Sequence, residues 1–146
     1  MNWHVQDLIK RALQDITTEN LIDAEQRSRG VFVAKSAGIV AGIAVAEQVF
    51  RTLDMDIEFT TIINDGEEAT PGDVIAVVEG RTRTLLMGER TALNFLQRLS
   101  GIATRTRRMV DLIRYEKAEI VDTRKTTPGS RWLEKYAIKV GGARNH

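Results

Sequence analysis

A short polar and cationic segment near the end of the chain, Asp122 to Gly129, follows an apolar run. The run Glu119-Ile120-Val121 has the composition of a buried strand, and Pro128-Gly129 ends regular structure. Arg124 and Lys125 therefore lie side by side where a strand runs out into a turn. Arginine offers a planar fork to a carboxylate or phosphate, and lysine offers a compact charge. The pattern indicates either an anion-binding loop or a solvated basic turn.

Charge is distributed unevenly along the 146 residues. Residues 1–80 contain 6 Lys and Arg and 14 Asp and Glu, a net charge of −8, whereas residues 81–146 contain 15 and 6, a net charge of +9. The basic part predicts an anionic ligand, a nucleic acid or a negatively charged partner surface. Packing of the acidic part against the basic part would also account for the asymmetry.

The chain has no cysteine, which excludes disulfides and thiolate chemistry and suits a reducing compartment. The N-terminus has no apolar signal core, and the longest apolar stretch, residues 38–46, is too short to cross a bilayer. We therefore expect a cytoplasmic protein with no membrane partner.

Hydrophobic periodicity predicts an α+β arrangement for the first part of the chain. An i, i+3, i+4 pattern indicates a helix from about Asn2 to Gln14, and a second apolar pattern indicates a short helix that ends near Leu53. Alternating or continuous apolar runs predict four strands, near residues 30–35, 38–43, 56–63 and 73–79.

The second part of the chain alternates between helix and strand signals. The best helix signal runs from Arg83 to Leu99, and Ser100-Gly101 is expected to end it. A helix at 104–116, a strand at 119–122 and a helix at 131–140 are expected to follow. This order is how a parallel α/β unit begins.

Four segments of the chain, in this order, resemble the quinolinate phosphoribosyltransferases, the carboxylating nicotinate-nucleotide pyrophosphorylases of NAD biosynthesis. They are Gly88-Glu89-Arg90-Thr91-Ala92-Leu93-Asn94-Phe95-Leu96, Ser100-Gly101-Ile102-Ala103-Thr104, Asp122-Thr123-Arg124-Lys125-Thr126-Thr127-Pro128-Gly129 and Gly141-Gly142-Ala143-Arg144-Asn145-His146. The resemblance implies an α+β N-terminal sandwich with its linking helix over residues 1–103. Residues 104–146 would be the truncated beginning of an incomplete α/β barrel.

The resemblance also implies a function. Members of the family are transferases that join quinolinate to phosphoribosyl pyrophosphate and release nicotinate mononucleotide, pyrophosphate and carbon dioxide. Mg²⁺ accompanies the sugar donor, and its ligands are expected beyond the end of this chain. The family forms dimers or dimer-based assemblies, so the expected partners are the two substrates and a second copy of the chain, with no nucleic acid.

Four residues of the chain match ligand-binding positions of the family. By resemblance, Arg124 and His146 hold the carboxylates of quinolinate, Lys125 bridges quinolinate and the donor as the catalytic residue, and Arg90 reaches into the neighbouring subunit's site. From the residues alone, a helix-surface cation is the better interpretation of Arg90, and a disordered terminal residue is nearly as good an interpretation of His146 as a ligand. Another cluster of arginines, Arg105, Arg107 and Arg108, is expected on a solvated helix face.

The chain departs from the family pattern in several places. Ala143 replaces a third glycine, and Ser130 replaces an apolar residue. The chain stops at His146, where an arginine follows in the family, so we expect a fragment that is inactive by itself. An unfinished barrel should leave Val121, Leu133 and Val140 exposed and should promote self-association.

Other classes of protein remain open. Pro71-Gly72-Asp73 before an apolar strand also occurs in lipoyl or biotinyl carrier domains, although Lys35 is the only lysine nearby and has no exposed hairpin signal. A nucleic-acid module would need aromatic residues interleaved with the basic ones, which the basic part lacks. A non-catalytic assembly domain and a related pyrophosphorylase acting on another acid are the remaining alternatives.

Overall fold

The protein, analysed as a computed structural model, is described over residues 3–13 and 22–146. Its main sheet is antiparallel and has the strand order β1-β5-β3, where β1 is Arg27–Val33, β3 is Glu58–Thr61 and β5 is Val74–Arg81. A shorter antiparallel pair joins β2 (Gly38–Ile39) to β4 (Glu68–Ala69). This sheet with packed helices confirms the predicted α+β arrangement.

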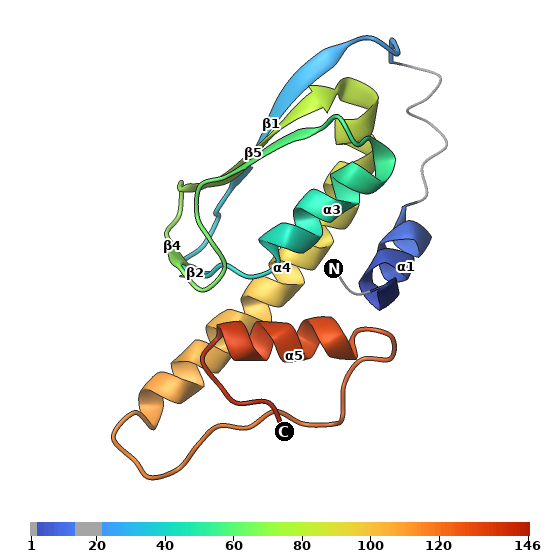
Figure 1. Ribbon diagram of the computed structural model, residues 1–146. Coiled ribbons are helices and arrows are strands. Elements are labelled where there is room, and N and C mark those ends of the chain that lie inside the picture. Colours follow the sequence, from blue (N-terminus) through green and yellow to red (C-terminus); the bar gives the residue numbers. More distant parts are fainter. Residues whose placement is uncertain (1–2, 14–21) are drawn as a thin grey trace.

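Two helices cover one face of the main sheet (Figure 1). They are α3 (Ile43–Leu53) and the first half of α4 (Thr82–Leu112). The rings of Phe32, Phe50 and Phe59 form the centre of the core, with centroids 6.0–6.3 Å apart. Gly88 allows α4 to approach α3, because a Cβ at this position would lie 2.7 Å from Phe50.

Helix α1 (Trp3–Ala12) adds Val5 and Ile9 to the same core. The expected ends of this helix, Asn2 and Gln14, lie outside the described residues. No helix in the described ranges is both long enough and apolar enough to span a membrane.

The prediction that Ser100-Gly101 ends a helix is wrong, because α4 continues to Leu112 and includes most of the second helix expected at 104–116. The Ser100 hydroxyl accepts a hydrogen bond from the N–H of Ala41 at 3.0 Å. One turn later, the Thr104 hydroxyl accepts one from the N–H of Ile39 at 2.8 Å. These tertiary bonds hold both sides of Gly101 in the helix and outweigh a glycine penalty of about 1 kcal/mol.

The strand expected at 38–43 is also shorter than predicted, because it ends at Ile39. Gly42 adopts a left-handed conformation with φ of 102°, and its N–H and that of Ile43 donate to the Asp65 carboxylate at 2.9 and 3.0 Å. A carboxylate at this position satisfies free donors at the start of α3 and complements the helix dipole. The chain thus leaves the sheet early in order to begin α3.

The last part of the chain packs across α4 through α5 (Arg131–Val140), as Figure 1 shows. Leu133 and Ala137 are buried in the core, so the prediction that Leu133 is exposed is wrong. Val140 is half-buried, whereas Val121 is exposed as expected. Closure of α5 against α4 explains this, since a partner surface for Leu133 already exists within the chain.

The strand expected at 119–122 is reduced to one parallel bridge between Val121 and Arg144. The N–H of Asp122 donates to the Arg144 carbonyl, and the N–H of Arg144 donates to the Ile120 carbonyl, both at 3.0 Å. Gly141 and Gly142 form the turn after α5, so the pairing with Val121 begins only at Arg144. The beginning of a barrel stays a prediction.

Candidate anion-binding site

The start of the cationic loop is fixed by the carboxylate of Asp122, whose side chain has no exposed surface. Asp122 accepts hydrogen bonds from the Lys135 ammonium at 2.6 Å and from the backbone N–H of His146 at 2.8 Å. The bond from Lys135, followed by the one from His146, outweighs burial and lowers the pKa of Asp122 below its ordinary value. The carboxylate therefore joins the loop, α5 and the C-terminal segment at one point.

The end of the loop is fixed by Glu134 of α5, whose side chain is only 11% exposed. Glu134 accepts a hydrogen bond from the N–H of Thr127 at 3.1 Å and another from the guanidinium of Arg98 on α4. Arg98 also donates to the Thr127 hydroxyl at 2.7 Å. Burial opposes ionisation of Glu134, but the bonds from Arg98 and Thr127 are stronger in sum and lower its pKa.

Local hydrogen bonds shape the loop between these two fixed points. The N–H of Lys125 donates to the Thr123 hydroxyl, and that of Thr126 donates to the Arg124 carbonyl, both at 3.1 Å. The guanidinium of Arg131 donates to the Thr126 hydroxyl at 3.1 Å. The loop is therefore held by its backbone and hydroxyl groups, without the side chains of Arg124 and Lys125.

Those two side chains are exposed, and neither forms a hydrogen bond or an ion pair with any of the residues that the structure describes. Unpaired cations on a constrained loop can be used to bind an anion, because the loop does not have to be reorganised first. Arg124 can supply two parallel donors to a carboxylate, and Lys125 can supply a point charge.

His146 is exposed, but its backbone is held in place. Its N–H donates to Asp122, as described above, and its carbonyl accepts a hydrogen bond from Lys135 at 3.5 Å. Since Asp122 lies two residues before Arg124, the structure brings Arg124, Lys125 and His146 into one region. Their predicted roles as ligands stay predictions.

Arg90 is separate from these three residues. It is exposed on α4, two turns before Arg98 and about 12 Å from it along the helix axis. Within residues 3–13 and 22–146 its side chain has no hydrogen-bonding or ionic partner. It shares one face of α4 with a row of other exposed residues: Asn94, Gln97, Gly101, Arg105 and Arg108.

The prediction for the arginine cluster is right for Arg105 and Arg108, which are exposed, but wrong for Arg107. Arg107 is half-buried, and its guanidinium donates to the carbonyls of Gly141 at 3.1 Å and Val140 at 3.5 Å. These carbonyls lie at the C-terminal end of α5, where a cation satisfies free acceptors and complements the helix dipole.

Comparison with known proteins adds an independent observation. The sequence profile described as the quinolinate phosphoribosyl transferase N-terminal domain matches residues 15–100, and that of the C-terminal domain matches residues 102–146. The chain belongs to the quinolinate phosphoribosyltransferase family. The resemblance inferred from the sequence is thus confirmed.

Individual members of the family resemble the chain closely but are longer. A protein of Bacillus subtilis (strain 168), described as a probable carboxylating nicotinate-nucleotide pyrophosphorylase, is 47% identical over 138 residues, which are 92% of this chain and 48% of that protein. A decarboxylating quinolinate phosphoribosyltransferase of Nicotiana tabacum is 42% identical over 132 residues, which are 90% and 37% of the two chains. The chain thus spans about half or less of the length of these relatives.

Solved structures agree with this assignment. The crystal structure of NadC from Streptococcus pyogenes matches with a TM-score of 0.93 and 38% identity, over 100% of this chain and 55% of that one. The nicotinate-nucleotide pyrophosphorylase of Pyrococcus furiosus matches with a TM-score of 0.66 and 18% identity, over 94% of this chain and 35% of that one, which shows a shared fold alone.

Sequence reasoning assigned no role to Arg98, Glu134 and Lys135 in this family member. One signal was available for Glu134, because it lies between the buried Leu133 and Ala137 on the inward face of α5. A carboxylate within an apolar stripe needs a buried partner. Nothing in the sequence indicates that the partner is Arg98, which lies 36 residues away.

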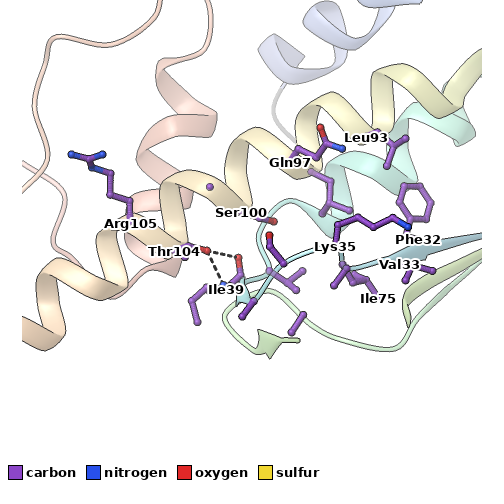
Figure 2. A pocket seen from close by; sticks show the side chains of 18 of the residues that line it. Phe32, Val33, Lys35, Ile39, Ile75, Leu93, Gln97, Ser100, Thr104 and Arg105 are labelled. Atoms are coloured by element: carbon purple, nitrogen blue, oxygen red, sulfur yellow. Dashed lines mark hydrogen bonds between the residues drawn. The ribbon is translucent and has the colours of Figure 1, made fainter. Parts of the chain in front are cut away.

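A cavity of about 680 Å³ lies elsewhere, between α4 and the segment that links β1 to β2 (Figure 2). Its lining includes the apolar residues Phe32, Ile39 and Leu93. The Lys35 side chain extends toward Phe32, and Arg105 lies at one end. None of the residues of the cationic loop lines it. It is therefore distinct from the candidate site.

The described part of the chain contains no group of three or more His, Asp or Glu residues placed to hold a metal ion. The acidic side chains of the site do not fit such a role either. Asp122 and Glu134 are already occupied by Lys135, Arg98 and backbone N–H groups. These residues therefore do not form a magnesium centre.

Proposed function

We propose that this chain supplies the quinolinate-binding loop of a quinolinate phosphoribosyltransferase. The reaction converts quinolinate and phosphoribosyl pyrophosphate to nicotinate mononucleotide, pyrophosphate and carbon dioxide. One observation carries the proposal: Arg124 and Lys125 are unpaired and exposed on a loop that is fixed at both ends, within a chain of this family.

The roles follow from charge and geometry. Quinolinate has two carboxylates on neighbouring ring atoms, so it needs fixed cations at a short spacing. Arg124 binds one carboxylate with its planar fork, and His146 binds the other. Lys125 lies next to Arg124 and bridges quinolinate to the phosphates of the donor, where it acts as the catalytic residue.

The proposal includes a second copy of the chain. Arg90 contacts none of the other three residues within the described ranges, so it would serve a neighbouring subunit's site. The exposed row on α4 that contains Arg90 and Gly101 supports this, because a Cβ at Gly101 would meet nothing within 4 Å in the chain itself. A glycine in an exposed helix interior leaves room for a close approach from outside.

Mg²⁺ enters the proposal only with the donor's pyrophosphate, since the described residues form no metal centre. A cytoplasmic location, expected from the sequence, belongs to the same proposal.

Calorimetric titration tests the function, with quinolinate as ligand and nicotinate as the matched monocarboxylate. We expect quinolinate to bind more tightly than nicotinate, and Arg124→Ala to remove most of the difference. Lys10→Ala is the control, because Lys10 is an exposed cation on α1. Equal affinity for both acids would favour a related pyrophosphorylase acting on another acid, and no affinity for either would favour a non-catalytic assembly domain.

A further inference from the structure

We propose that Glu134 and Arg98 are positioning residues, which set the geometry of Arg124 and Lys125 without touching the ligand. The inference rests on the function proposed above, because the ligand is the same dianion. It adds a residue from α4 and one from α5 to the machinery of the loop.

The contacts of Glu134 and Arg98 converge on one residue of the loop. Glu134 accepts the N–H of Thr127, Arg98 donates to the Thr127 hydroxyl, and Glu134 and Arg98 bond to each other. Three elements of the fold, α4, the loop and α5, therefore meet in a closed ring of hydrogen bonds. We call Arg98, Thr127 and Glu134 the loop clamp.

The contribution of the loop clamp to the free energy of folding does not by itself explain why a charged pair occupies this place. Glu134 is largely removed from water, and apolar residues of the same size often stabilise a protein at least as well as an ion pair that has lost its water. An apolar side chain at position 134 could extend the buried surface of Leu133 and Ala137 on α5. It would leave the N–H of Thr127 without its acceptor. The charged pair thus supplies directional bonds to the loop, which an apolar pair cannot.

Because the loop is short, the bonds at its two ends also restrict the positions of Arg124 and Lys125. Only four residues, 123–126, separate Asp122 from Thr127. Asp122 is held by Lys135, and Thr127 is held by the Glu134 carboxylate. Because a segment of n residues spans at most about 3.6 Å × n, a loop of this length has little freedom between fixed ends. The backbone of Arg124 and Lys125 therefore keeps its place unless one of the ends is released.

Two of the arginines on α4, Arg90 and Arg98, have different surroundings. Arg98 points to its own chain's loop, whereas Arg90 has no partner in the described residues and belongs to the exposed row. Arg98 is only half exposed, with 52% of its side chain accessible, because the loop and Glu134 cover part of it. Its guanidinium is already committed to Thr127 and Glu134, so it is not available as a ligand in the way that Arg124 is.

The test uses three variants of the loop clamp in the whole 146-residue chain. Glu134→Gln keeps the shape and removes the charge, Arg98→Lys keeps the charge and removes the fork, and Thr127→Val removes only the hydroxyl. Glu116→Gln and Arg114→Lys are matched controls, because both residues are exposed near the end of α4. Thermal unfolding verifies that each variant folds. If Glu134→Gln does not fold, the same measurements are made on Thr127→Val.

Two readouts separate positioning from general stability. Amide hydrogen exchange of Lys125 and Thr127 should accelerate at least tenfold in Glu134→Gln, while exchange in β5 stays unchanged. Quinolinate affinity by calorimetry should fall about tenfold in Glu134→Gln and less in Arg98→Lys. Adding Glu134→Gln to a variant in which Arg124 and Lys125 are both alanine should cause no further loss of affinity, because the loop clamp acts through these two cations.

Any of three results would overturn the proposal. Unchanged quinolinate affinity with faster exchange would make the loop clamp a purely structural feature. A further loss from Glu134→Gln when both cations are already alanine would mean that Glu134 acts on the ligand independently of them. Failure of the unaltered chain to bind quinolinate would count against the proposed function instead. In that case the amide exchange rates decide the question. Faster exchange in Glu134→Gln supports a loop positioned by Glu134, and unchanged exchange refutes the positioning role.

Discussion

The two parts of the molecule are held together by different forces. The sheet with α3 and the first half of α4 encloses a core of aromatic and aliphatic side chains, in which Phe50 and Ile9 are almost fully buried. The segment after α4 buries few apolar side chains, and its loop is held by the carboxylates of Asp122 and Glu134. Apolar packing is non-directional and nearly independent of pH, whereas carboxylate bonds are directional and depend on ionisation. The first part is therefore a scaffold, and the directional bonds of the second part fix the conformation of the cationic loop.

The largest effect is expected from the scaffold. Phe50→Ala removes a ring that is 1% exposed and contacts the rings of Phe32 and Phe59, so the free energy of unfolding should fall by about 3–5 kcal/mol. Met55→Ala is the control, because Met55 is 73% exposed. Chemical denaturation measures both. A loss below about 1 kcal/mol for Phe50→Ala would show that the aromatic cluster is not the centre of the core.

Acid should distinguish the two parts of the molecule. The folded-state pKa values of Asp122 and Glu134 lie below their ordinary values, so their stabilising contribution is present above the unfolded pKa and is lost as the pH falls through the folded pKa. As the pH is lowered below about 4, the amides of residues 122–127 should lose protection from exchange before those of β5.

Amide exchange monitored by NMR between neutral pH and about pH 3 gives this comparison for every residue at once. Simultaneous loss in both parts would mean that the loop is not held by these carboxylates.

A smaller effect is expected at the ligand site. Arg124→Lys keeps the charge but loses the second parallel hydrogen bond. Since a hydrogen bond to a charged group contributes about 1.5–3 kcal/mol, and about 1.4 kcal/mol is a factor of ten, quinolinate affinity should fall about ten- to a hundredfold.

Affinity for phosphoribosyl pyrophosphate should fall less in Arg124→Lys, whereas Lys125→Ala should weaken both ligands. Calorimetry with each ligand separates the two roles. If only the affinity for phosphoribosyl pyrophosphate decreases in Arg124→Lys, Arg124 is a phosphate ligand.

The smallest effect concerns the helix that joins the two parts. Gly101 lies in the interior of α4 and a Cβ would meet nothing there, so Gly101→Ala should stabilise the isolated chain by about 1 kcal/mol. Gly88→Ala is the opposite control, because its Cβ would clash with Phe50. Thermal unfolding of both variants at low protein concentration is sufficient. Destabilisation by Gly101→Ala would indicate a break in α4 at this position.

The sequence predicted the scaffold better than the site. Strong periodicity located α5 and most strands, and the glycine-containing segments identified the family. Periodicity could not show that α4 continues through Gly101, because the deciding bonds join Ser100 and Thr104 to residues 39–41, about sixty positions earlier in the chain. In the same way, the motif gave Arg124 and Lys125 but not Arg98, since its pairing with Glu134 exists only after α5 has packed against α4.

The central claim is that Arg124 and Lys125 form a ready anion site on a loop that is already fixed. Chemical-shift mapping by NMR of the ¹⁵N-labelled chain, titrated with quinolinate, tests it most directly. We expect saturable shifts confined to residues 123–127 and the segment near His146, with unchanged exchange protection in the scaffold. Shifts that instead cluster around the cavity of Figure 2, near Lys35 and Arg105, or shifts that spread along the chain without saturation, would contradict the claim.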